Sequence, residues 1–142
     1  MSYDIGRHFD NSFKLEPYFH WARLTRFTND MENVPLWGRE RDTISFGADF
    51  AYVPADLYIT LSGARHGSLW ADSDQIAPLA PSVVIDFSIK KGLYTFGDYG
   101  KANIKVAVKN VFNEDYQTSF TDEDFLDTQP GRSFYVALEY AY

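Results

Sequence analysis

The sequence predicts an all-β protein, an antiparallel up-and-down meander of about six strands. Three observations support this fold class. Apolar and polar residues alternate with a period of two through most of the chain, and turn-forming clusters of Gly, Pro, Asn and Asp separate the alternating segments. Aromatic residues make up 18% of the 142 residues. No apolar run approaches the ~18 residues that a membrane helix needs, so only strands of this chain could cross a membrane.

The alternation is clearest at the C-terminus. The apolar or aromatic positions there are Phe134, Val136, Leu138, Tyr140 and Tyr142, with smaller, charged or amphipathic residues between them. Successive side chains of a strand point to opposite faces, so this segment has one apolar and one polar face. Such an apolar face packs on a second sheet in a soluble sandwich and meets lipid in a transmembrane barrel. The terminal tyrosines favour lipid, because tyrosine rings suit the headgroup level of a bilayer.

Five earlier segments show the same alternation. They span residues 13–22, 43–52, 57–64, 83–90 and 102–109. Pro17 lies inside the first segment and predicts a local irregularity there, because proline cannot donate to the ladder. On the polar faces of these strands, the charged residues Asp49, Asp86, Lys105 and Lys109 are expected to line the lumen of a barrel, together with Glu139 of the last strand.

The connections between the strands alternate in length. Residues 26–42, 71–81 and 113–129 predict long polar loops, whereas 53–56 and 91–100 predict shorter connections. All long loops then leave one end of the sheet, as the extracellular loops of outer-membrane barrels do. A soluble antiparallel meander would show the same alternation, and this alternative remains open.

Two motifs near the C-terminus resemble a known family. Pro-Gly-Arg-Ser-Phe-Tyr-Val at 130–136, followed by the alternating strand, resembles the C-terminal strand of TonB-dependent outer-membrane receptors. Asn-Val-Phe-Asn-Glu-Asp-Tyr at 110–116 is similar to the motif of the penultimate strand in the same receptors. The segment 79–86, in which Pro81 precedes an apolar strand, looks like a strand entry of the family. The family most often ends on Phe, so Tyr142 is a departure.

The resemblance implies a 22-stranded barrel around an N-terminal plug. It implies uptake of a scarce ligand (a siderophore, vitamin or saccharide) with energy delivered by TonB through the plug. Localisation would be the bacterial outer membrane. Phe134, Val136, Leu138, Tyr140 and Tyr142 would form the signal read by the barrel-assembly machinery. Residues 1–142 would be the C-terminal barrel segment alone, without plug, N-terminal strands or signal peptide, and would not transport by themselves. The expected partners are outer-membrane lipid and the remainder of the receptor.

Composition and motifs disfavour other classes of function. A net charge of −7 disfavours nucleic acid, whose binding needs Lys and Arg. No catalytic motif is present, so no enzyme, cofactor or metal site is predicted, and the acidic run 122–124 reads as a solvated loop. Aromatic residues in or beside the long loops are candidates for ligand binding at the extracellular mouth: Trp37, Trp70, Tyr116 and Phe120. The alternative to a receptor fragment is a small self-standing β-barrel or a soluble β-sheet binding module.

Overall fold

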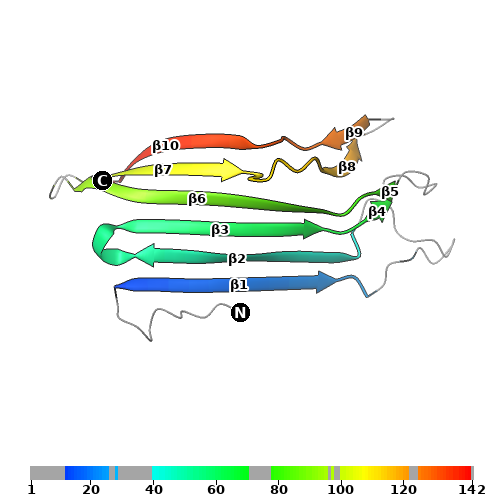
Figure 1. The fold of residues 1–142 in the computed structure, drawn as a ribbon, viewed down its shortest axis with the longest axis horizontal. Coiled ribbons are helices and arrows are strands. Elements are labelled where there is room, and N and C mark those ends of the chain that lie inside the picture. The colour runs from blue at the N-terminus through cyan, green and yellow to red at the C-terminus, as the bar shows by residue number, and fades with distance from the viewer. Residues whose placement is uncertain are drawn as a thin grey trace.

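The chain forms one open antiparallel sheet of six strands. A computed structural model describes residues 12–25, 28, 40–70, 78–95, 97, 100–121 and 125–141. The strand order is β1-β2-β3-β6-β7-β10, so each strand pairs with the next large strand along the chain (Figure 1). The bounds are β1 Phe13–Arg23, β2 Asp42–Tyr52, β3 Leu57–His66, β6 Ser82–Thr95, β7 Lys101–Lys109 and β10 Ser133–Ala141. The all-β class and the six-stranded meander predicted from the alternation are therefore confirmed.

Two small hairpins extend from one end of this sheet. β4 (Leu69–Trp70) pairs with β5 (Pro78–Leu79), and β8 (Gln117–Thr121) pairs with β9 (Phe125–Thr128). Both lie at the right-hand end of Figure 1, which we call the loop end. The short 3-10 turn η2 (Val53–Ala55) lies at the other end, the turn end. The prediction of plain loops at 71–81 and 113–129 was wrong where these hairpins form.

β6 is longer than predicted. The alternation indicated a strand at 83–90 followed by a connection, whereas β6 continues to Thr95. A register shift between Gly92 and Tyr94 explains the error, because one extra residue interrupts the period of two. After this bulge Tyr94 lies opposite Ala102, and the pairing with β7 resumes.

Pro17 causes no irregularity, contrary to the prediction. β1 and β2 pair without a shift, and Pro17 lies opposite Ala48. Just beyond the strand ends, the amide of Leu24 donates to the Arg41 carbonyl, so hydrogen-bonded pairs in this ladder involve the even residues of β1. Pro17 therefore has its nitrogen directed away from β2, toward the open edge of the sheet, where no donor is required.

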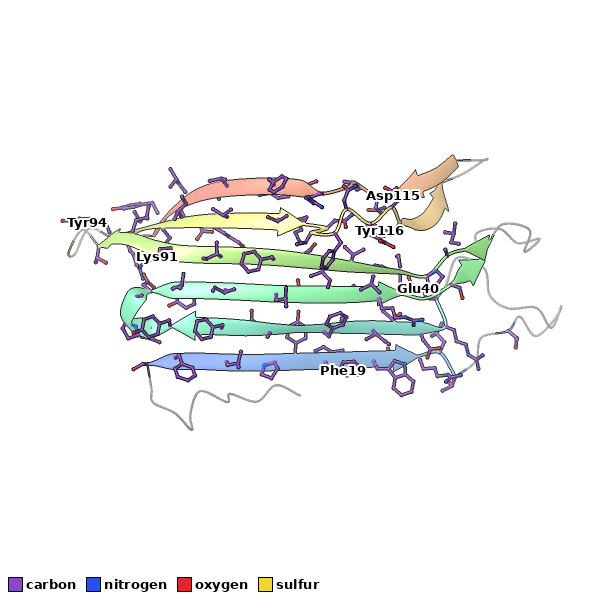
Figure 2. The ribbon with its side chains drawn as sticks, in the orientation of Figure 1. Phe19, Glu40, Lys91, Tyr94, Asp115 and Tyr116 are labelled. Carbon is purple, nitrogen blue, oxygen red and sulfur yellow. The ribbon has the colours of Figure 1, made fainter. Side chains whose placement is uncertain are left out.

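The register separates the side chains into two faces of opposite character (Figure 2). The apolar face consists of Phe13, Leu15, Pro17, Phe19, Trp21, Ile44, Phe46, Ala48, Phe50, Tyr52, Leu57, Ile59, Leu61, Gly63, Val83, Ile85, Phe87, Ile89, Ala102, Ile104, Val106, Val108, Phe134, Val136, Leu138 and Tyr140. The polar face carries Lys14, Glu16, Tyr18, His20, Ser45, Asp49, Tyr58, Thr60, Ser62, His66, Asp86, Ser88, Lys90, Lys101, Asn103, Lys105, Lys109, Tyr135 and Glu139. Asp49, Asp86, Lys105, Lys109 and Glu139 share this polar face, and their position in the lumen of a barrel stays a prediction.

The apolar face is largely uncovered. Among the described residues Leu79 is the only buried apolar side chain, whereas Val136 is 71% and Leu138 is 77% exposed. No helix in the described ranges is long and apolar enough to span a membrane. A single sheet with one exposed apolar face has no packed core, so this face requires an apolar environment from outside the described residues.

Aromatic rings cover two glycines of the sheet. Tyr18 lies opposite Gly47 on the polar face, and Phe46 lies opposite Gly63 on the apolar face. A Cβ atom at Gly47 would lie 2.3 Å from the carbonyl oxygen of Leu61 and 2.5 Å from the Tyr18 hydroxyl. Glycine at position 47 therefore allows β3 and the Tyr18 ring to approach the β2 backbone.

Gly47→Ala is expected to destabilise the sheet by about 1–3 kcal/mol, because the added methyl group overlaps a backbone oxygen that cannot swing away. The free energy of unfolding in urea, measured in detergent micelles, tests this. Ser45→Ala is the control, since it lies on the same face of β2 and adds no volume. Equal stability of the two variants would contradict the close approach.

The turn after β7 is tied to the start of β10. Asn110 is buried and has a positive φ of 51°. Its side-chain NH2 donates to the Glu114 carbonyl, and its side-chain oxygen accepts from the Glu114 backbone amide. Asn113, with φ of 56°, accepts from the Arg132 amide through its side-chain oxygen at 2.9 Å. The two sequence motifs at 110–116 and 130–136 thus form one hydrogen-bonded junction. Arg132 contributes its backbone amide to this junction.

Candidate functional site

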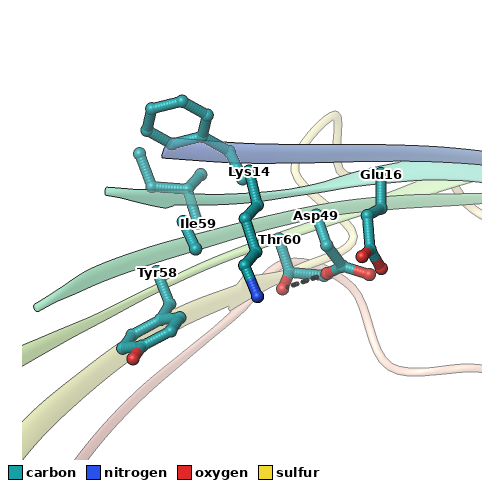
Figure 3. A pocket seen from close by; sticks show the side chains of 8 residues that line it. Lys14, Glu16, Asp49, Tyr58, Ile59 and Thr60 are labelled. Atoms are coloured by element: carbon teal, nitrogen blue, oxygen red, sulfur yellow. Dashed lines mark hydrogen bonds between the residues drawn. The ribbon is translucent and has the colours of Figure 1, made fainter. Parts of the chain in front are cut away.

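A groove on the polar face near the turn end is lined by charged, hydroxyl-bearing and aromatic side chains (Figure 3). Its volume is about 320 Å³. The side chains that line it on the polar face come from three adjacent strands: Lys14 and Glu16 of β1, Asp49 of β2, and Tyr58 and Thr60 of β3. The alternation of these strands brings them together, because the register places Glu16 opposite Asp49 and Asp49 opposite Thr60.

The groove offers donors, acceptors and an aromatic ring within one small area. The hydroxyl of Thr60 donates to Asp49 at 2.7 Å, which fixes that carboxylate in place. The Lys14 amine and the Glu16 carboxylate form no ion pair with each other or with another described residue, and both side chains are exposed. This arrangement can bind a polar ligand through hydrogen bonds and aromatic contact.

Ion pairs join the strands beside this groove. Lys90 of β6 and Glu139 of β10 meet at 2.5 Å across β7, and Lys101 forms a further pair with Asp56. Asn103, which is buried, lies between them and helps to line a smaller cavity of about 220 Å³. These pairs fix the charged side chains of the polar face at the turn end. Lys14 and Glu16 in the neighbouring groove take part in none of these pairs.

Asp56 connects the turn η2 to strands β6 and β7. It ends η2 with a positive φ of 49°, its carbonyl accepts from the Gly92 amide, and its carboxylate pairs with Lys101. The hydrogen bond from Lys101, followed by the charges of Lys101 and Lys91, lowers the pKa of Asp56 despite partial desolvation. The charged form of this carboxyl therefore favours the folded turn.

Acid is expected to loosen this turn. The pKa of Asp56 in the folded protein lies below its unfolded value of about 3.9. The stability that ionised Asp56 contributes is therefore present above that pH and is lost as the pH falls through the folded pKa. The protection factor of the Gly92 amide, which is its exchange rate corrected for the intrinsic effect of pH, should fall below about pH 4, and in Asp56→Asn it should be low and independent of pH in that range. Unchanged acid dependence in Asp56→Asn would assign the effect to another carboxyl group.

A second cluster lies at the loop end of the polar face. The carboxylate of Glu40 accepts from Nδ1 of His66 and from the Gly67 amide, both at 2.9 Å. The His66 ring stacks on Tyr116, with ring centroids 5.6 Å apart and planes 15° apart. Figure 2 shows Glu40 and Tyr116 at this end of the sheet.

The predicted ligand-binding residues have different outcomes. Tyr116 lies at the loop end as expected, and its contact there is with His66. Trp70 pairs with Pro78 in β4–β5, and Phe120 pairs with Leu126 in β8–β9, through their backbones. Trp37 lies outside the described residues. Ligand binding by these four residues therefore remains a prediction.

The residues predicted as an assembly signal lie on one face. Phe134, Val136, Leu138 and Tyr140 are exposed on the apolar face of the edge strand β10, and Tyr142 lies outside the described residues. Acidic residues 122–124 also lie outside them. No cluster of three metal-binding side chains occurs in the described part of the chain.

Sequence reasoning missed the groove and the Glu40 contact. The alternation placed Lys14, Glu16 and Tyr58 on the polar side of their strands, but it did not give the register that joins them. Glu40 lay inside a segment read as a long loop, and only its side-chain contacts with His66 reveal it.

The fold defines an open antiparallel β-sheet with one polar and one apolar face. Comparison with known proteins adds no relative, since no family model, curated protein or solved structure matches the chain.

Proposed function

We propose that this chain is part of the lipid-facing wall of an outer-membrane β-barrel, the C-terminal portion of a 22-stranded receptor of the TonB-dependent type. The observation that carries the proposal is the uncovered apolar face, which runs over all six strands while the opposite face is polar and charged. Lipid outside and a hydrated lumen inside account for both faces at once.

The ends of the apolar face support the same proposal. Tyr52, Tyr94 and Tyr140 are exposed at its turn end, and Trp21 is exposed at its loop end. Aromatic girdles at both interfaces are typical of membrane barrels, because these rings are amphipathic. The long connections at the loop end would be extracellular.

The open edges require further strands. Within the part of the chain that the structure describes, β1 and β10 each pair on one side only, and unpaired backbone groups are costly in hydrocarbon. The remainder of the receptor would close the barrel and supply the plug through which TonB energy reaches a siderophore, vitamin or saccharide. The junction of residues 110–116 with 130–136 supports the receptor family, since it links the two motifs that resemble it.

The proposal is tested in washed outer membranes of the native cell. An antibody against residues 113–129 is used on gels with and without boiling of the sample. A heat-shifting band several times larger than 16.3 kDa is expected. A band at the chain's own mass outside the membrane fraction would overturn the proposal and favour a soluble β-sheet binding module.

A further inference from the structure

Charged residues interrupt the apolar face at its loop end. We call Trp21, Arg23, Asp42 and Arg65 the rim cluster. Trp21 and Arg65 lie in one row across β1, β2 and β3, with Ile44 between them, and Arg23 lies opposite Asp42 in the next row. The two arginines are thus about 12 Å apart, given two strand spacings across the sheet and two residues along it. They lie on the same face as Phe46 and Leu61, immediately beyond the apolar band.

The contacts within the rim cluster leave one positive charge. Asp42 accepts from the Trp21 indole at 3.1 Å, and its carboxylate lies 3.8 Å from Nε of Arg23. Arg65 is exposed and forms no ion pair within the described ranges. Two guanidinium groups and one carboxylate therefore give a net charge of +1, although the whole chain carries −7.

The turn end of the same face differs. Its exposed aromatic residues are tyrosines, and Lys91, the cation there, donates to the Ala55 carbonyl. Trp21 and the uncompensated Arg65 together thus distinguish the loop end. A guanidinium group beside an apolar band lies at headgroup depth, where it can form two parallel hydrogen bonds to one phosphate group.

We propose that the rim cluster binds the phosphate of an anionic lipid headgroup. Arg65 is the principal ligand, Arg23 is the second, and Trp21 anchors the edge of the apolar face in the interface. Asp42 restrains Arg23 and so limits the affinity. The inference rests on the proposed lipid-facing role of this face, and it adds a preferred lipid chemistry at one of its two ends.

The test compares binding of the full chain to two vesicle types by flotation: phosphatidylcholine alone, and phosphatidylcholine with a minor fraction of phosphatidic acid. The net charge of the chain disfavours the anionic vesicles, so only a local site would reverse that preference. Wild type is expected to prefer the anionic vesicles, and Arg65→Gln should reduce its binding to them by about five-fold. Asp42→Asn, which can still accept from Trp21, should increase it by a similar factor.

Lys105→Gln is the matched control. It removes one exposed positive charge from the polar face and should leave the vesicle preference unchanged. Equal binding of wild type to both vesicle types, or equal losses in Arg65→Gln and Lys105→Gln, would overturn the lipid-phosphate site. In that case, the lipid-facing role would still be supported if wild type binds phosphatidylcholine vesicles and Val136→Arg binds them more weakly. Absence of binding to either vesicle type would overturn both.

Discussion

Val106→Arg is expected to weaken insertion of the sheet into a bilayer by about 2–4 kcal/mol if position 106 lies near the midplane. Val106 lies on the apolar face between Ile89 and Val136, away from both ends of the strands. A guanidinium group at that depth loses its hydration and has no partner on an otherwise apolar surface. The measurement is the fraction of folded, heat-modifiable chain in the outer-membrane fraction after expression.

Ala107→Arg is the matched control for this prediction. Position 107 is the next residue of β7 and lies opposite Ser88 and Tyr135 on the polar face. The same side chain would there point toward water and neighbouring polar groups, so membrane assembly should be close to that of wild type. Normal assembly of Val106→Arg would count against lipid contact at this face.

Asn110→Ala is expected to lower the free energy of unfolding by about 2–4 kcal/mol. The substitution leaves the half-buried backbone amide and carbonyl of Glu114 without their side-chain partner and places an alanine at a φ of 51°. The backbone amide at position 110 can still donate to Asp86, as it does at 2.8 Å in wild type. The loss of stability therefore comes from the side-chain hydrogen bonds and from the backbone conformation at this position. Urea unfolding in detergent micelles measures the effect.

Asn110→Gly separates the two contributions. Glycine adopts positive φ without cost but provides no side-chain hydrogen bonds, so its stability should lie between those of wild type and Asn110→Ala. A loss below about 0.5 kcal/mol in Asn110→Ala would show that water replaces the side chain at the junction.

The sequence predicted the strands well because each is half exposed and has a clear period of two. β2 and β7 differ from their predicted bounds by a single residue. The errors occurred where pairing with a neighbouring strand decided the structure and the pattern within one segment did not. Pro17 disturbs no pairing with β2 because its nitrogen is directed away from that strand, and β6 extends to Thr95 because pairing with β7 resumes after the register shift between Gly92 and Tyr94.

The candidate sites were harder to predict, because they depend on register and on contacts between distant segments. The alternation assigned Lys14, Asp49 and Tyr58 to one side of their strands, but only the pairing of three strands places them around one groove. Likewise, Tyr116 was selected as a loop aromatic, whereas its partner His66 lies 50 residues earlier in the chain.

Hydrogen bonds between the two ends of the β8–β9 hairpin close it off where it leaves the sheet. The Gln129 amide donates to the Tyr116 carbonyl at 3.0 Å, and Asn113 holds the Arg132 amide. Both ends of the hairpin are therefore fixed before the chain enters β10. A foreign peptide inserted between Thr121 and Phe125 should leave the register of β7 and β10 intact, which makes this hairpin a position for displaying epitopes or for varying loop length.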